Sequence, residues 1–352
     1  MRQATLARRL LVSQETGLVI VVLIVMIVLS ALAGSHADRL TGAMVNNFLN
    51  SNTLIQVATD ASFFAIMAIG ATIVIISGGI DLSVGSIYAL AGVSMGLALR
   101  ALGPAGSFTT VLVGLVTCVG VGLLCGLLNG ALIVGLRVHS FIITLGTMWV
   151  LRGIAFVGTK AESILVPFQV TAVTKTSLGL HGGLYPVPML VMLLTTVAGW
   201  LYLTRTVMGR HIFAFGGNLE ASRFAGLALG RIQLGVYAVS GLTAGIAAFL
   251  GASFYGSASS GDGQGYELYV IASAVVGGAS LIGGKGSAIG ATLGALLIVL
   301  IRQSIRTLHF DQNYEWIIIG CAIIVAVLVD RWSAGVTSRR LARTAAPTGA
   351  TA

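Results

Sequence analysis

Charged residues are scarce in this sequence. Only 9% of its 352 residues are Asp, Glu, Lys or Arg, whereas a soluble domain has about 25%. Hydrophobic residues make up 56% of the chain, so there is too little charge to cover a surface that faces water. This composition excludes a soluble enzyme of this length and predicts a membrane protein.

Cysteine and proline are scarce as well. The three cysteines, Cys118, Cys125 and Cys321, lie in apolar runs and lack the spacing of a metal site or a disulfide framework. The chain has only five prolines and no Gly-X-Y period, so its 47 glycines do not indicate collagen. In a membrane protein, abundant glycine indicates helices that pack backbone against backbone.

The apolar runs predict an all-α polytopic membrane protein with about ten transmembrane helices. A spanning helix needs about 20 mostly apolar residues, and the alternating pattern of a membrane β-barrel is absent. Because three of the runs are short or merge, eight to eleven spans remain open. The predicted spans are residues 18–34, 53–77, 84–99, 108–135, 140–158, 186–204, 232–253, 266–282, 286–301 and 314–331.

Basic residues between the spans predict the orientation. With the N-terminus inside, 13 Lys or Arg residues fall in inner segments and 6 in outer segments, and such an excess marks the cytoplasmic side. We therefore expect a cytoplasmic N-terminal segment (1–17), a transmembrane domain (18–331) and a disordered, basic cytoplasmic tail (332–352). The first span also resembles a signal peptide that ends at Ala31-Leu32-Ala33, although an uncleaved first helix is favoured.

Two glycine-flanked breaks interrupt the apolar pattern, at residues 77–86 and 276–287. Broken helices at corresponding positions of two halves are typical of transporters, and unwound backbone at membrane depth must be buried in protein or line a cavity. The alternative is a tight turn at each place on the membrane surface. For the first break this alternative is serious, because Asp81-Leu82-Ser83 also suits the start of a helix.

Four charged residues lie in or near the predicted spans, and intramembrane charge often marks function. Each of them alternatively sits in the interface or pairs with another group. They are Asp60, Asp81, Arg152 and Glu267.

Small residues repeat at every fourth position in three helical segments. Such faces allow two helices to approach closely, so we expect a structural role for them. The glycines are Gly122, Gly126 and Gly130; Gly241 and Gly245; and Gly286, Gly290 and Gly294.

The enzyme motifs in the chain lack either a required residue or the structural context that catalysis needs. The G-x-S-x-G match at 92–96 lies inside an apolar helical run, not at a strand–turn–helix elbow. The five histidines are scattered over different loops. Residues 279–287 hint at a phosphate loop, but Ala279 replaces its first glycine and Gly286 replaces the Ser or Thr after Lys285. We therefore predict no catalytic residue, no metal site and no nucleotide site in this chain.

The long inner loop at 205–231 carries four arginines. Asn218 is a suitable N-cap and Glu220 falls in the first turn after it, so residues 218–228 suit a short helix. Such a helix either docks a soluble partner or belongs to a solvated basic loop that only fixes the topology.

Several segments resemble a known family. They are residues 76–86, 126–130, 141–148, 214–222, 240–242 and 271–278. Through them, residues 54–330 resemble the permease subunits of bacterial ABC importers for monosaccharides of the ribose, xylose, arabinose and rhamnose type. These subunits are related to branched-chain amino-acid permeases, and the resemblance implies a type II ABC importer-like fold.

The resemblance also implies partners. A cytoplasmic ABC ATPase subunit would bind ATP and Mg, a periplasmic protein would deliver the sugar, and a second permease copy or a sister permease would complete the pathway in the inner membrane. No nucleic-acid partner is implied. The segment at 209–230 would supply the coupling helix, although the family's Glu-Ala-Ala pattern appears only as Glu220-Ala221-Ser222. The expected coupling residues are Gly209, Gly217, Asn218, Glu220, Ala221 and Gly226.

We therefore expect a permease that moves a monosaccharide or a similar small polyol by alternating access while a partner hydrolyses ATP. A neutral sugar needs hydroxyl-matched donors and acceptors, and the candidate pathway residues are Asp81, Ser83, Asn129 and Thr144. The alternatives are an ABC permease for another small solute, such as a branched-chain amino acid, and a secondary transporter driven by an ion gradient. An intramembrane enzyme is a further rival class, which the scattered histidines and serines do not support.

Overall fold

The structure is a computed structural model that describes residues 14–37, 42–177, 185–322, 324–325 and 328. The predicted basic tail and most of the predicted N-terminal segment lie outside these residues. Helices dominate the described part. They are α2 (Gln14–Leu32), α3 (Ser51–Ile76), α4 (Val84–Leu102), α5 (Ser107–Leu136), α6 (Ser140–Thr159), α7 (Phe168–Thr174), α8 (Val187–Arg205), α9 (Val207–Gly217), α10 (Leu219–Phe224), α11 (Leu229–Tyr255), α12 (Tyr266–Val276) and α13 (Ala288–Thr307).

Eight of these helices are long and apolar enough to cross a membrane: α2, α3, α4, α5, α6, α8, α11 and α13. All eight coincide with predicted spans, so the all-α polytopic fold is confirmed, but the count of ten is not. The span predicted at 266–282 stops at Val276. Its 11 residues reach only about 16 Å, which is half of a hydrocarbon core of about 30 Å. Residues 314–322 form a further helix where the last span was predicted.

Side-chain caps explain where several helices begin. Asn50 accepts a hydrogen bond from Thr53 N at the start of α3, Thr206 accepts one from Gly209 N at the start of α9, and Ser287 accepts one from Gly290 N at the start of α13. Each cap satisfies a backbone N–H that the first helical turn leaves free. Short polar residues therefore mark helix starts even in this apolar chain.

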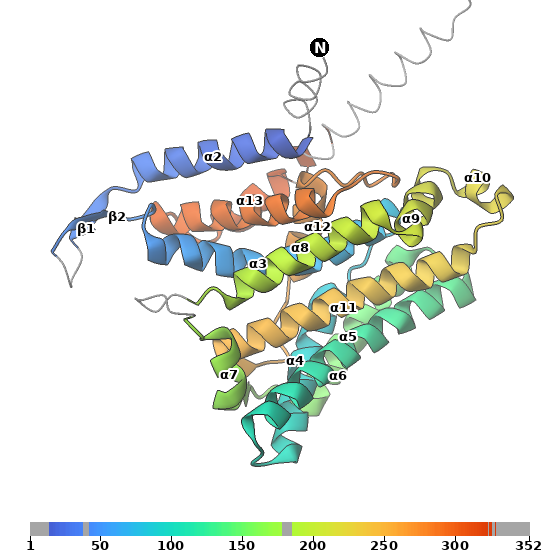
Figure 1. The fold of residues 1–352 in the computed structure, drawn as a ribbon, viewed down its shortest axis with the longest axis horizontal. Coiled ribbons are helices and arrows are strands. Elements are labelled where there is room, and N and C mark those ends of the chain that lie inside the picture. Colours follow the sequence, from blue (N-terminus) through green and yellow to red (C-terminus); the bar gives the residue numbers. More distant parts are fainter. Residues whose placement is uncertain (1–13, 38–41, 178–184, 323, 326–327, 329–352) are drawn as a thin grey trace, which may run out of the picture.

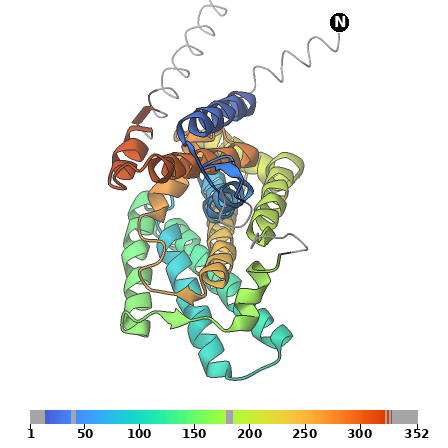
Figure 2. The ribbon, with the colours of Figure 1, turned by 90° about the vertical axis from the view of Figure 1, so that its left-hand side faces the viewer.

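The helices are stacked in an order that differs from the chain order (Figure 1). From one side to the other they run from α2 through α13 and α3 to α11 and α5. Figure 2 views the molecule from the end that carries a small hairpin, β1 (Ser35–Ala37) and β2 (Met44–Asn46). Helices α9 and α10 lie at the opposite end of the molecule, which we call the α9–α10 end. A second strand pair, β3 (Ile164–Leu165) with β4 (Ser257–Ala258), joins two connecting segments.

The predicted small-residue faces are helix contacts. A Cβ atom on Gly122 would lie 2.3 Å from the carbonyl oxygen of Gly241, and one on Gly245 would lie 2.5 Å from that of Cys118. The same holds between α12 and α13, where a Cβ on Gly294 would lie 2.0 Å from the oxygen of Ser273. Only glycine permits such a close approach, so these glycines have the predicted structural role. Gly286 does not belong to such a face, because α13 begins at Ala288 and Gly286 lies in the second break.

Candidate functional site

The first break contains a buried polar network. The carboxyl group of Asp81 accepts hydrogen bonds from the backbone N and the hydroxyl of Ser83, at 2.9 and 2.6 Å, on one oxygen. Its other oxygen accepts from Ser240 Oγ of α11 at 2.7 Å. Asn129 of α5 donates to Ser83 Oγ at 2.7 Å. The network therefore ties the break to two neighbouring helices.

The fourth candidate, Thr144, holds the same break from α6. Its hydroxyl lies 3.2 Å from the carbonyl oxygen of Ile80, and Ser140 Oγ accepts from Ile80 N at 3.1 Å. Asp81, Ser83, Asn129 and Thr144 are each at most 2% exposed. The structure thus brings the four candidates together at one place, inside the protein.

The position of Asp81 helps to distinguish an unwound segment at membrane depth from a tight turn at the membrane surface. Ser240 lies 11 residues after the start of α11, which is about 16 Å along the helix axis. Asp81 therefore lies well inside the bundle and not at the end of α11. Helix α4 begins at Val84, directly after Ser83, so Asp81-Leu82-Ser83 is also a helix start. The break is an unwound segment. Its part at Asp81 and Ser83 is buried in protein, as membrane depth requires, whereas Gly78 is exposed.

The predicted docking loop forms two short helices, α9 and α10, at the α9–α10 end (Figure 1). Asn218 Oδ1 accepts from Ala221 N at 2.9 Å, so the predicted N-cap is confirmed, and Glu220 lies in the first turn. Gly209, Gly217 and Gly226 lie in or beside these helices; a Cβ on Gly209 would lie 2.3 Å from the oxygen of Leu203. Leu219 and Phe224 are 55% and 89% exposed.

Three glycine-containing segments meet beside these helices. A Cβ on Gly216 of α9 would lie only 1.7 Å from the carbonyl oxygen of Ile76, at the first break. The same oxygen accepts a hydrogen bond from Gly284 N of the second break, at 2.8 Å. Gly283 and Gly284 have φ angles of +94° and +73°, which residues with a Cβ rarely adopt. Both sequence breaks therefore pack on α9, backbone against backbone.

A cavity of about 350 Å³ lies at the same place. It is lined by the first break, at residues 77–79, by the α9–α10 connection, at residues 215–219, and by Tyr237 of α11. The hydroxyl of Tyr237 is buried beside Ser140. The contact between the first break and the α9–α10 connection is thus incompletely packed.

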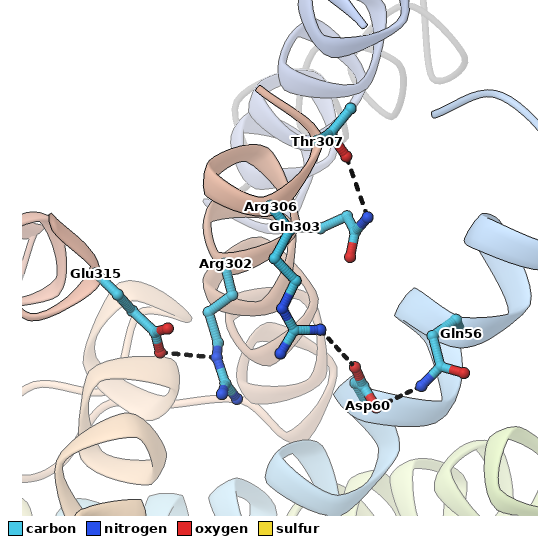
Figure 3. Close-up of polar contacts among 7 residues, drawn as sticks. All are labelled: Gln56, Asp60, Arg302, Gln303, Arg306, Thr307 and Glu315. Atoms are coloured by element: carbon cyan, nitrogen blue, oxygen red, sulfur yellow. Dashed lines mark hydrogen bonds and ion pairs between the residues drawn. The ribbon is translucent and has the colours of Figure 1, made fainter. Parts of the chain in front are cut away.

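Asp60 belongs to a polar cluster on α3 and α13 (Figure 3). Its carboxyl group lies 3.6 Å from Arg306 Nη1 and accepts from Gln56 Nε2 at 2.9 Å. One turn away on α13, Arg302 Nε lies 2.7 Å from Glu315 Oε1. These charges pair with one another, as intramembrane charges usually do, and they join α3, α13 and the last described helix.

Arg152 and Glu267 lie close to one another, and Asp262 is a third charged residue nearby. Arg152 Nη1 of α6 donates to the carbonyl oxygens of Ser260, at 2.9 Å, and Asp262. Glu267 lies in the first turn of α12. Both residues line a cavity of about 270 Å³. No group of three or more His, Cys, Asp and Glu side chains that could hold a metal ion occurs in the described residues.

Sequence reasoning did not assign a role to Ser240, Ser140 or Gly216. Ser240 appeared only as part of a family segment, and it lies 159 residues from Asp81 in the chain. Gly216 sits in a Gly-Gly pair that gives no sign of which glycine contacts a neighbour. Only the tertiary contacts distinguish these residues.

Comparison with known proteins places the chain in a family. Residues 53–327 match the family described as the permease component of the branched-chain amino acid transport system. The chain belongs to this permease family. It is 36% identical to the ribose import permease protein of Escherichia coli (strain K12) over 285 residues, which cover 81% of this chain and 87% of that protein.

Two other relatives are of similar length. The permease is 35% identical to the D-allose transport system permease protein of Escherichia coli (strain K12), over 81% of this chain and 85% of that protein. It is 31% identical to the fructose import permease protein of Rhizobium meliloti, over 81% of this chain and 79% of that protein. The named substrates of these three relatives are all monosaccharides.

Proposed function

We propose that this chain is the membrane-spanning subunit of an ATP-binding cassette importer that carries a monosaccharide across the bacterial inner membrane. The family match and the sugar-import names of its relatives support this function. ATP and Mg would bind to a cytoplasmic ATPase subunit, and a periplasmic protein would deliver the sugar. The α9–α10 end, and with it both chain termini, would face the cytoplasm.

One observation carries the proposal: α9 packs through Gly216 on the backbone of both breaks. A displacement of α9 by an ATPase would therefore move the backbone at Ile76 and at Gly284 directly. The first of these segments leads within five residues to Asp81, which accepts hydrogen bonds from Ser83, directly before α4, and from Ser240 of α11. Movement at the membrane surface would in this way reach the bundle interior, where the packed helices rock between outward-open and inward-open states.

The exposed face of α10 suits a protein partner. Phe224 and Leu219 present apolar side chains to the outside, and Glu220 and Arg223 stand between them in the sequence. Exposed aromatic side chains that are flanked by charge are frequent anchors of protein interfaces. We assign this face to contact with the ATPase.

The test is purification of the permease from native membranes under gentle conditions. We expect an ABC ATPase and a second permease copy or sister permease to co-purify. The recovered complex is then reconstituted in proteoliposomes with the binding protein, and uptake of radiolabelled D-ribose, D-allose, D-fructose and L-leucine is measured with and without ATP. ATP-dependent uptake of at least one sugar is the expected result.

Two outcomes would contradict the proposal. Uptake by this chain alone, driven by a proton or sodium gradient, would favour a secondary transporter. ATP-dependent uptake of L-leucine without uptake of any sugar would favour the second candidate, an amino-acid permease, which the description of the matching family supports.

A further inference from the structure

The cavity beside Arg152 and Glu267 lies among the transmembrane helices and combines a mostly apolar lining with two charged side chains. It lies between α4, α6 and the segment that enters α12, and it is lined by Ser86, Met148, Trp149, Arg152, Phe156, Gln264 and Glu267. Its volume of about 270 Å³ is just below the range of about 300–1,000 Å³ that is typical for drug-sized ligands. The pocket therefore has room for a smaller molecule.

Two polar atoms in this pocket lack a partner. Ser86 is completely buried, yet its hydroxyl has no hydrogen-bond partner within the described part of the chain. The same is true of Glu267 Oε2, which is also buried. Buried polar atoms are nearly always paired, because an unpaired one costs free energy. Both atoms lie behind the wall of one pocket, where a polar ligand would complete them once the two side chains turn toward it.

The backbone around the pocket holds both charged side chains in place. Arg152 is fixed by the carbonyl oxygens of Ser260 and Asp262, which leave the other N–H groups of its guanidinium free to face a ligand. The carboxyl group of Glu267 lies against Gly85, where a Cβ would come within 2.6 Å of Oε2. A site that is held rigid in this way loses little entropy when a ligand binds.

We infer that this pocket binds the transported monosaccharide during its passage through the membrane; the inference rests on the proposed function. Sugar hydroxyl groups both donate and accept hydrogen bonds, so they match the acceptor on Glu267, the donors on Arg152, and Ser86 and Gln264, which do both. The C–H face of the sugar ring packs on Trp149 and Phe156, which are 69% and 40% exposed and supply apolar surface.

Two variants test the pocket in the reconstituted complex. Ser86→Ala removes a hydroxyl group that bonds to nothing in the protein, so the melting temperature should not fall, whereas sugar uptake should fall about threefold. Glu267→Gln keeps the shape of the side chain but weakens its hydrogen bonds, and uptake should fall about tenfold. Glu162→Gln, an exposed site outside the pocket, is the matched control and should leave uptake unchanged.

Cysteine labelling gives a readout that does not depend on transport. Gln264 lines the pocket and is exposed, so Gln264→Cys in a Cys321→Ser background should react with a maleimide. D-Ribose, D-allose or D-fructose should slow this reaction if it occupies the pocket, and L-leucine should not. The same sugars should leave the labelling of Glu162→Cys unchanged.

The two readouts separate this inference from the proposed function. ATP-driven sugar uptake with neither a variant effect nor protection would overturn the pocket assignment and leave the permease function intact. Protection by a sugar without uptake would support the pocket and count against import. Protection by L-leucine alone, or an absence of both uptake and protection, would overturn both.

Discussion

At the scale of single residues, Asp81 is the residue that joins the first break to α11. A carboxyl group that is buried without partners is costly, and here hydrogen bonds from Ser83 and Ser240 reduce that cost. Because the two serines belong to different parts of the chain, these bonds also fix the first break against α11. Asp81 is thus a structural centre, and we assign direct contact with the sugar to the pocket at Glu267.

Replacing Asp81 by Asn tests this assignment. The amide retains one acceptor oxygen, so at least one serine hydroxyl would face an NH₂ group. We expect a loss of about 1–3 kcal/mol in stability, seen as a lower melting temperature of the detergent-purified permease. Asp311→Asn, at an exposed position, is the control. Equal melting temperatures of Asp81→Asn and the wild type would contradict the network.

The sequence identified the members of this network, and their part in the sugar pathway stays a prediction. Asp81, Ser83, Asn129 and Thr144 stood out because polar residues are rare in apolar runs, and the structure brings all four together. Their hydrogen bonds to one another could not be predicted, because nothing in the sequence says which polar groups bond to one another. That information lies in contacts between distant segments, such as the 159 residues between Asp81 and Ser240.

At the scale of helices, the glycine faces of α5 and α11 determine how closely these helices pack. Gly122→Ala would place a Cβ 2.3 Å from the oxygen of Gly241, whereas a Cβ on Gly120 of the same helix meets nothing within 4 Å. Gly120→Ala should therefore be neutral or slightly stabilising, because alanine favours the helix. Gly122→Ala should destabilise the protein by about 1–3 kcal/mol. Thermal unfolding in detergent compares the two variants, and equal melting temperatures would contradict the packing.

A second glycine pair tests the path from α9 to the breaks. Gly216→Ala would force α9 away from Ile76, while a Cβ on Gly235 of α11, outside the predicted coupling residues, meets nothing within 4 Å. We expect Gly216→Ala to insert and assemble but to lose most sugar-stimulated ATP hydrolysis, and Gly235→Ala to retain it. The measurement is ATPase activity of the reconstituted complex with and without loaded binding protein. Normal stimulation in Gly216→Ala would argue against this path.

The short helix α12 shows that a continuous apolar run does not determine where a helix ends. Residues 266–282 are apolar enough to look like one span, but the helix ends at Val276. It ends there because Gly277 packs on α13, where a Cβ would lie 2.4 Å from the oxygen of Gly290, and Gly278 has a φ of +98°. Hydropathy describes how apolar the side chains of a segment are and does not show where its helical backbone ends. It therefore predicted eight spans correctly and missed the half-helix beside the pocket.

At the scale of the whole molecule, the two ends present different surfaces. The α9–α10 end exposes Phe224, which is 89% exposed. Phe108 at the start of α5 is 80% exposed, and α5 begins at the foot of the view in Figure 1, away from α9 and α10. If the ATPase binds at the α9–α10 end, only one of these aromatic side chains lies in its interface.

Phe224→Ser and Phe108→Ser form a matched pair for this assignment. Removing an aromatic anchor from an interface costs about 2 kcal/mol or more, so Phe224→Ser should reduce the amount of ATPase that co-purifies by about tenfold or more. Phe108→Ser should recover the ATPase at the wild-type level, because the start of α5 lies away from α9 and α10. Quantitative immunoblotting of equal amounts of purified permease measures both. Loss of the ATPase in Phe108→Ser with retention in Phe224→Ser would reverse the orientation of the permease, because the docking surface would then lie beside the start of α5.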